Sequence, residues 1–290
     1  MSESWRRVTT YGWTMATTTR RPVRPPSKGL QLMEAAWLPV EAAGFWAVGP
    51  YLRVLGRGDQ HPVLLLPGFA ATDESTAPLR MALRSQGYWA HSWHLGRNLG
   101  PTSKIVTGMR HRIEELHDEH GRTVSLVGQS LGGVFARHLA RERPDLVRQV
   151  ITLGSPYRMV EGDRSAAQPL WERVSHLHDG DLGSDIAALA EQDRPPLVVP
   201  ATSIYSRTDG VAPWQTCIDE VREQTENIEV RGSHVGMGVN PAVVIAVLDR
   251  LAQPEGDWRH FAPPLGLRSW YPKPAGWHER KPVRRTRHAA

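Results

Sequence analysis

The clearest chemical signal in the sequence is the segment GQSLG at residues 128–132. It follows residues 123–127, an apolar run typical of a buried strand, and it leads into residues 131–141, whose apolar spacing predicts a helix. A serine flanked by glycines between a strand and a helix is the pattern of a nucleophile elbow, because glycine lets the two elements approach closely. We therefore predict Ser130 as a nucleophile, with a purely structural turn as the alternative.

A serine hydroxyl needs a base to become nucleophilic, and an acid must orient that base. Among the 13 histidines of the chain, His234 is selected because it follows the last predicted core strand. Asp209 follows the preceding strand, whereas five other aspartates lie between residues 157 and 196. Ser130, Asp209 and His234 occur in the chain order that accompanies a nucleophile elbow. We predict them as a catalytic triad, although an Asp-Gly pair also suits a simple turn.

The elements that must position these side chains alternate between strands and helices. Strands are predicted at residues 63–66, 87–93, 123–127, 150–153, 197–205 and 228–230, and helices at 77–86, 105–120, 131–141 and 243–251. Such alternation predicts an α/β fold with a mostly parallel central sheet and helices on both faces. In sheets of this kind the chemistry lies at the carboxyl ends of the strands, where the three predicted catalytic residues fall.

Residues from about 61 to 251 resemble the α/β-hydrolase superfamily, in particular its bacterial lipase and esterase branch. Four segments carry the resemblance in the family's order: LLPGF at 65–69, GQSLG at 128–132, the strand and loop around Asp209, and the loop around His234. The resemblance implies an oxyanion hole formed by the backbone N–H groups of Phe69 and Leu131. In the first segment proline replaces the histidine of the family pattern.

Two segments interrupt the alternation. Residues 29–60 are predicted as a helical lead-in, and residues 157–196 form an insertion whose apolar spacing predicts two short amphipathic helices. We expect the insertion to form a short helical cap over the site, with a rigid excursion that completes the core as the alternative. Four side chains are candidates for a substrate pocket, and each is equally compatible with ordinary packing: Gln129, Trp171, Trp214 and Met237.

Composition limits the remaining function classes. The net charge of +5 arises at the ends, because residues 1–28 carry a net +5 and residues 268–290 a net +6. Both ends are rich in proline, so we predict flexible basic arms over 1–28 and 266–290 around a core at 61–265. This distribution argues against a folded basic face, and we do not expect nucleic-acid binding. Peripheral contact with a membrane is left open.

The chain has 290 residues and one cysteine, Cys217, which excludes an intrachain disulfide and a cysteine-rich metal site. No apolar run reaches the length of a membrane span, about 18 residues. No secretory signal is recognised at the N-terminus, so we expect a cytoplasmic protein. Neither a metal nor an organic cofactor is needed for the predicted chemistry.

Together these features predict a serine hydrolase that cleaves a carboxylic ester through an acyl-enzyme intermediate. The expected substrate is a small-molecule or lipid-like acyl ester. Acyl transfer and thioester hydrolysis would use the same residues and stay open as alternatives. A hydrolase fold that only binds ligands is a further alternative, and the oligomeric state is not predicted.

Overall fold

The computed structural model describes residues 22–52, 58–160, 162–178, 191 and 194–275. A six-stranded sheet forms its centre, in the order β2-β1-β3-β4-β5-β6, and all neighbouring strands are parallel. The strands are β1 (Pro62–Leu66), β2 (Trp89–Ser92), β3 (Val124–Gln129), β4 (Val147–Leu153), β5 (Ala201–Ser206) and β6 (Thr225–Val230). The prediction of a mostly parallel sheet is confirmed.

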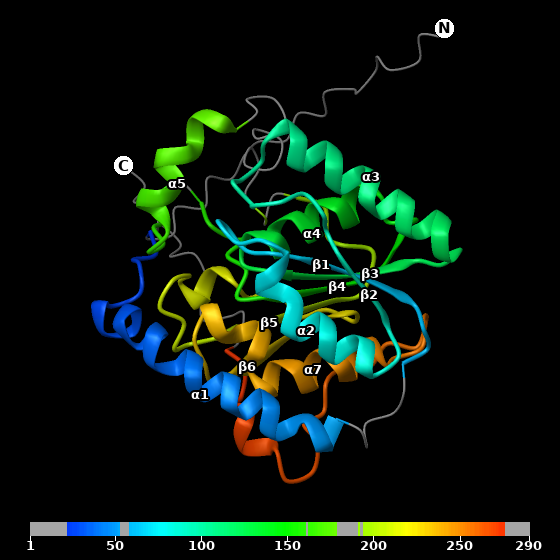
Figure 1. The fold of residues 1–290 in the computed structure, drawn as a ribbon. Coiled ribbons are helices and arrows are strands. Elements are labelled where there is room, and N and C mark those ends of the chain that lie inside the picture. The colour runs from blue at the N-terminus through cyan, green and yellow to red at the C-terminus, as the bar shows by residue number, and fades with distance from the viewer. Residues whose placement is uncertain (1–21, 53–57, 161, 179–190, 192–193, 276–290) are drawn as a thin grey trace, which may run out of the picture.

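Helices cover both faces of the sheet (Figure 1). The α-helices are α1 (Lys28–Leu52), α2 (Asp73–Ser85), α3 (Ser103–His120), α4 (Leu131–Glu142), α5 (Gln168–Val174) and α7 (Pro241–Leu251). Short 3₁₀ helices are η1 (Ser175–Leu177), η3 (Trp214–Thr216), η4 (Val235–Val239) and η5 (Arg268–Trp270). In Figure 1, α3 and α4 lie above the sheet, and α1, α2 and α7 lie below it.

Strand β1 shows why its sequence is apolar without alternation. Val63 and Leu65 belong to the hydrophobic cluster under α1, α2 and α7, whereas Leu64 and Leu66 belong to the cluster under α3 and α4. Successive side chains of a strand point to opposite faces. Because both faces are covered, every position of the strand is buried, as expected for a central strand of a parallel sheet.

The C-terminal segment differs from the prediction of a flexible tail from residue 266. Tyr271 and Ala275 are buried. The Tyr271 hydroxyl donates to the carbonyl of Ala242 in α7 at 2.9 Å, and the backbone N–H of Ala275 donates to the Tyr205 hydroxyl at 2.6 Å. The segment is basic overall, which suggested a solvated tail, but its aromatic and apolar side chains pack against the core.

Other predictions fall outside the described residues. These include the basic arm as far as residue 21, the tail from residue 276, and the second amphipathic helix expected around residues 186 and 189. Within the described ranges, no helix combines the length and the apolar character that crossing a bilayer requires.

Candidate active site

The turn between β3 and α4 holds Ser130 in a strained conformation. Its backbone has φ 51° and ψ −121°, a region that residues with a side chain rarely adopt. The flanking glycines are required by close approach. A Cβ atom on Gly128 would meet the backbone of Gly132, and a Cβ atom on Gly132 would meet the carbonyl of Leu66. The sequence therefore forces a sharp turn between β3 and α4, at which Ser130 is partly exposed.

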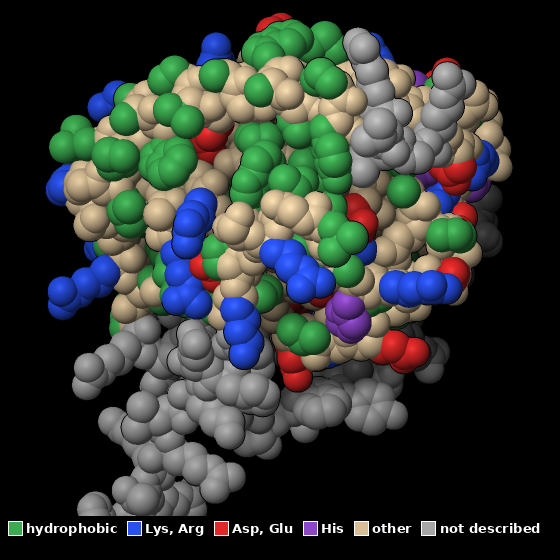
Figure 2. Space-filling model, turned by 90° about the horizontal axis from the view of Figure 1, so that it is seen from below, with side chains coloured by type: hydrophobic (Ala, Val, Ile, Leu, Met, Phe, Trp, Pro, Cys, Tyr) green, Lys and Arg blue, Asp and Glu red, His purple; other side chains and the backbone are tan. Residues whose placement is uncertain are grey.

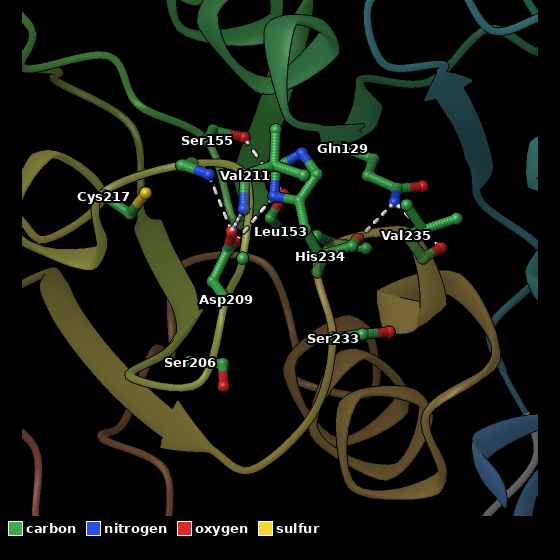
Figure 3. A network of polar contacts seen from close by, with 12 residues as sticks. Gln129, Leu153, Ser155, Ser206, Asp209, Val211, Cys217, Ser233, His234 and Val235 are labelled. Atoms are coloured by element: carbon green, nitrogen blue, oxygen red, sulfur yellow. Dashed lines mark hydrogen bonds and ion pairs between the residues drawn. The ribbon is translucent and has the colours of Figure 1, made fainter. Parts of the chain in front are cut away.

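Asp209 and His234 form a buried pair (Figure 3). His234 Nδ1 lies 2.6 Å from Asp209 Oδ2. The other carboxylate oxygen, Oδ1, accepts hydrogen bonds from the backbone N–H groups of Val211 at 2.8 Å and Ala212 at 2.7 Å. The loop after β5 thus holds the carboxylate in place, and the carboxylate holds the imidazole ring through Nδ1. Nε2 is the ring nitrogen that is left for other contacts.

The charge environment of His234 favours the protonated ring. Burial alone lowers its pKa, but the negative charge of Asp209 and the hydrogen bond that the ring donates to Asp209 outweigh this effect. A smaller contribution comes from the charge of Glu34 on α1. The net result is a pKa above the ordinary histidine value. A base of this kind holds a proton well once it has accepted one.

Backbone and side-chain contacts bring the three residues to one place. The backbone N–H of Ser130 donates to the carbonyl of Leu153 at the end of β4, at 2.8 Å. Gln129 Nε2 donates to the carbonyl of His234 at 2.9 Å (Figure 3). A Cβ atom built on Gly154 would lie 3.2 Å from Asp209 Oδ2. The carboxyl ends of β3, β4 and β5 therefore converge on this site.

Within the described part of the chain, the Ser130 hydroxyl forms no hydrogen bond with another residue. Contacts between a nucleophile and its base are often long when substrate is absent, and they tighten in the reacting complex. The evidence that the structure offers for grouping Ser130 with His234 is therefore the convergence of the strand ends, and not a hydrogen bond between the two side chains.

The two residues whose backbone N–H groups the resemblance assigns to an oxyanion hole, Leu131 and Phe69, belong to segments that lie next to Ser130. Leu131 is the first residue of α4, and no side chain caps that helix, so its N–H lies among the free donors of a helix start. On the other side, a Cβ atom on Gly68 would lie 3.2 Å from Ser130 Cβ, which places the turn carrying Phe69 against the serine. Asn98 holds that turn, since its side-chain amide donates to the Pro67 carbonyl at 2.8 Å.

The predicted pocket residues take different places. Trp171 of α5 packs on Phe69, with ring centroids 5.3 Å apart, so the described part of the insertion covers the turn next to Ser130. Met237 is buried in the core cluster, and a Cβ atom on Gly154 would meet both its sulfur and the Asp209 carboxylate.

Trp214 packs beside strand β5 and the loop that carries Asp209. Its ring stacks on Tyr205 at 5.8 Å and lies 4.6 Å from the Arg207 guanidinium. These contacts are with β5 and the loop that follows it. They correspond to the packing alternative that the sequence left open for this tryptophan.

Two glutamates of α1 complete the site, and sequence reasoning missed both. Glu34 Oε1 accepts from the backbone N–H of Gly210 at 2.7 Å and from that of His234 at 2.9 Å, while Oε2 accepts from Val235 at 3.0 Å. One carboxylate therefore joins the loop that carries Asp209 to the loop that carries His234. Charged groups strengthen such bonds, so Glu34 acts as a clamp across both loops.

Glu41, seven residues after Glu34 in α1, also bonds the loop that carries His234. Its Oε1 accepts from the backbone N–H of Ser233 and from Asn240 Nδ2, both at 2.9 Å, and its Oε2 accepts from the Ser233 hydroxyl. Glu34 and Glu41 are the only charged residues between positions 29 and 52. A spacing of seven places them on one helix face, which is the signal that could have indicated their role.

The described residues contain no group of three or more histidine, cysteine, aspartate or glutamate side chains arranged to hold a metal ion.

Solved structures of lipolytic enzymes share this architecture. The structure of the metagenome-derived lipolytic enzymes LipS and LipT gives a TM-score of 0.53 at 17% sequence identity, covering 68% of this chain and 95% of that chain. Lipase B of Aspergillus fumigatus gives a TM-score of 0.50 at 18% identity, covering 70% of this chain and 56% of the lipase. No protein-family model and no curated protein sequence matches this chain. The parallel sheet and these likenesses show that the chain has the α/β-hydrolase fold.

Proposed function

We propose that this protein is a serine hydrolase that cleaves a carboxylic ester through an acyl-enzyme intermediate. The observation that carries the proposal is the buried His234–Asp209 pair, with a 2.6 Å contact, at the strand ends that also present the strained Ser130 turn. A strained serine conformation costs folding free energy, on the order of 1–3 kcal/mol. Its presence beside a histidine oriented by a carboxylate supports a nucleophile more than a simple turn.

The proposed reaction has two halves. Ser130 Oγ attacks the acyl carbon while His234 Nε2 takes the hydroxyl proton, and the carbonyl electron pair moves onto oxygen. The tetrahedral species collapses, the ester C–O bond breaks, and His234 returns the proton to the leaving alkoxide. Water then loses a proton to His234 and attacks the acyl-Ser130 ester, which releases the acid and restores the serine.

Two features would stabilise the charges that develop. The N–H groups of Leu131 and Phe69 would bind the oxyanion, and removal of one such donor typically costs about 3 kcal/mol of transition-state stabilisation. The carboxylate of Asp209 would balance the imidazolium form of His234. The raised pKa of His234 is consistent with this balance.

The surroundings of Ser130 favour an apolar acyl group. Phe69 and Trp171 form an aromatic wall at the turn beside the serine. Leu170, Leu177 and Val235 are exposed on the elements next to it. Apolar lining with few polar groups is typical of sites for lipid-like substrates.

A panel of p-nitrophenyl esters of increasing acyl length tests the proposal. The wild-type chain should turn over at least one ester, Ser130→Ala should lose that turnover, and Ser85→Ala, an exposed serine at the end of α2, should keep it. Product analysis with added alcohol separates the reactions that share these residues. Formation of a new ester in place of the free acid would assign acyl transfer rather than hydrolysis to the protein. Turnover by Ser130→Ala equal to that of the wild type would refute Ser130 as the nucleophile.

A further inference from the structure

Helix α1 has an unusual distribution of charge between its two sides. Glu34 and Glu41, its two acidic residues, both bond the catalytic loops. Its remaining buried residues, Phe45, Val48 and Leu52, pack in the core. Surface helices normally turn their charged residues to water and their apolar residues inward. In α1 the charges face inward, and the outward side contains none between residues 29 and 52.

The outward side of α1 is a continuous apolar stripe. Leu32 is 79% exposed, Val40 61% and Trp46 69%. The members of this outer stripe recur at helical spacing and are all exposed: Leu32, Pro39, Val40, Ala43, Trp46 and Pro50. A helix rises 1.5 Å per residue, so the part from Leu32 to Trp46 extends over about 21 Å. Figure 2 views the molecule from below, the side on which α1 lies in Figure 1, and hydrophobic side chains gather in the upper part of this view, with Lys and Arg side chains mostly to the left of them and below them.

Contiguous exposed apolar surface of this kind marks an interaction site. We propose that the outer stripe of α1 docks on the surface of an anionic lipid bilayer, with the helix lying in the plane of the interface. Helices that lie in the interface bury tryptophan and aliphatic side chains among the headgroups and acyl chains. Among the described residues no helix could span the bilayer, so α1 would bind at its surface.

Charge identifies the lipid surface as anionic. The stripe itself carries no charge, and the exposed cations Arg24 and Lys28 stand directly before it. Each basic residue near an anionic membrane contributes about 1 kcal/mol of attraction. An uncharged stripe next to cations matches the acyl region and the headgroups of such a membrane.

A second copy of the chain fits the same surface less well. The exposed cations Arg24 and Lys28 would meet no acidic partner on the stripe of a second copy, because the two glutamates of α1 face inward. Two helices that cross touch over a short contact, whereas a flat lipid surface can cover the whole length of the outer stripe at once. Lipid is therefore the occupant that both the shape and the charge of this side favour.

Docking through α1 would also orient the candidate site. Glu34 bonds the loops of Asp209 and His234 on the inner side of the same helix. Val235, which follows His234 and is exposed, lies in the 3₁₀ helix held by that glutamate. The membrane contact would therefore lie next to the loops of the site. The inference does not depend on catalysis, because Ser130→Ala should dock as the wild type does.

Vesicle flotation with the full-length chain tests the inference. The probes are vesicles of phosphatidylcholine alone and vesicles of phosphatidylcholine with phosphatidylserine in equal parts. The double variant Val40→Glu/Trp46→Glu places two charges on the outer stripe at side chains that are 61% and 69% exposed, and the Trp46 ring also meets the buried Phe45 ring at 5.5 Å. The matched control, Val198→Glu/Val221→Glu, introduces the same charge at residues that are 75% and 55% exposed on another part of the molecule. Thermal unfolding and sedimentation of each variant accompany the assay.

The inference predicts binding to the anionic vesicles that weakens with added salt. It predicts a loss of at least about tenfold in the Val40→Glu/Trp46→Glu variant and little change in the control. Three results would overturn it: no vesicle binding, equal loss in both double variants, or equal binding to neutral vesicles. Dimerisation without vesicle binding, abolished by the α1 substitutions, would assign the stripe to a second copy instead. If the double variant unfolds, Val40→Ala/Trp46→Ala replaces it and should weaken binding in the same direction.

Discussion

Replacing Glu34 tests whether α1 positions the loops that carry Asp209 and His234 and helps to raise the pKa of His234. The structure gives this carboxylate three backbone donors, at 2.7, 2.9 and 3.0 Å. Glu34→Ala leaves all three N–H groups without their acceptor. A buried unsatisfied donor costs about 1–3 kcal/mol, and water can reach this half-buried position, so we expect a total loss of about 3 kcal/mol. For a protein of this size 1 kcal/mol corresponds to about 2–4 °C in Tm, which predicts a decrease of about 6–12 °C.

Glu34→Gln separates the charge from the hydrogen bonds. The amide oxygen can still accept from Gly210 and His234, and only the acceptor for Val235 is lost, so the expected cost is about 1 kcal/mol. The missing negative charge removes one of the influences that raise the pKa of His234. A general base acts in its neutral form, and a lower pKa keeps it neutral to lower pH. The acid limb of kcat/KM against pH should therefore move to lower pH.

Glu41→Gln is the matched control, because Glu41 bonds Ser233 and Asn240 rather than His234. It should lower the Tm and leave the acid limb in place. Calorimetry and pH profiles on the ester that the wild type turns over measure both effects. An unchanged acid limb in Glu34→Gln, or an equal shift in Glu41→Gln, would show that Glu34 acts on folding alone.

Three further predictions use the same assays. Asp209→Asn should lower kcat by about four orders of magnitude near neutral pH, because an amide cannot hold the productive histidine tautomer. The exposed Asp118→Asn should leave kcat unchanged, and an Asp209→Asn variant that turns over as fast as the wild type would exclude Asp209 as the acid. Gly132→Ala should destabilise the fold by about 1–3 kcal/mol, because its Cβ would meet the Leu66 carbonyl. Gly49→Ala, with open space around it, should not destabilise the fold, and equal Tm values for the two variants would contradict the close packing of the turn at Gly132. Trp171→Ala/Leu177→Ala should shift the preference among acyl lengths without changing the labelling of Ser130 by a small phosphonate, and an unchanged length profile would argue for plain packing of the insertion.

Local features of the sequence were sufficient to predict the sheet and the turn at Ser130. Uninterrupted apolar runs such as that of β1 arise because both faces of a parallel sheet are covered. The glycines at 128 and 132 mark a close approach between a strand and a helix that no other residue permits. These signals depend on neighbours in the chain or on burial alone, so they can be recognised without knowledge of tertiary contacts.

The contributions of α1 could not be predicted in the same way. Glu34 bonds N–H groups 176, 200 and 201 residues further along the chain. Its partners are backbone groups, which leave no trace in the amino-acid types of those loops. Tyr271 similarly packs on α7 from a segment whose basic composition predicts a tail. Long-range contacts between a side chain and the backbone therefore limit what the sequence shows.

The most direct test of the central proposal is the mass of the intact protein during reaction with a slowly hydrolysed ester. Quenching in acid during the first turnover should trap a species heavier by one acyl group, and peptide mapping should place that group on Ser130. The adduct should be absent from Ser130→Ala and should accumulate in His234→Ala only at a greatly reduced rate. Turnover with no covalent adduct, or an adduct on another residue, would contradict an acyl-enzyme formed on Ser130.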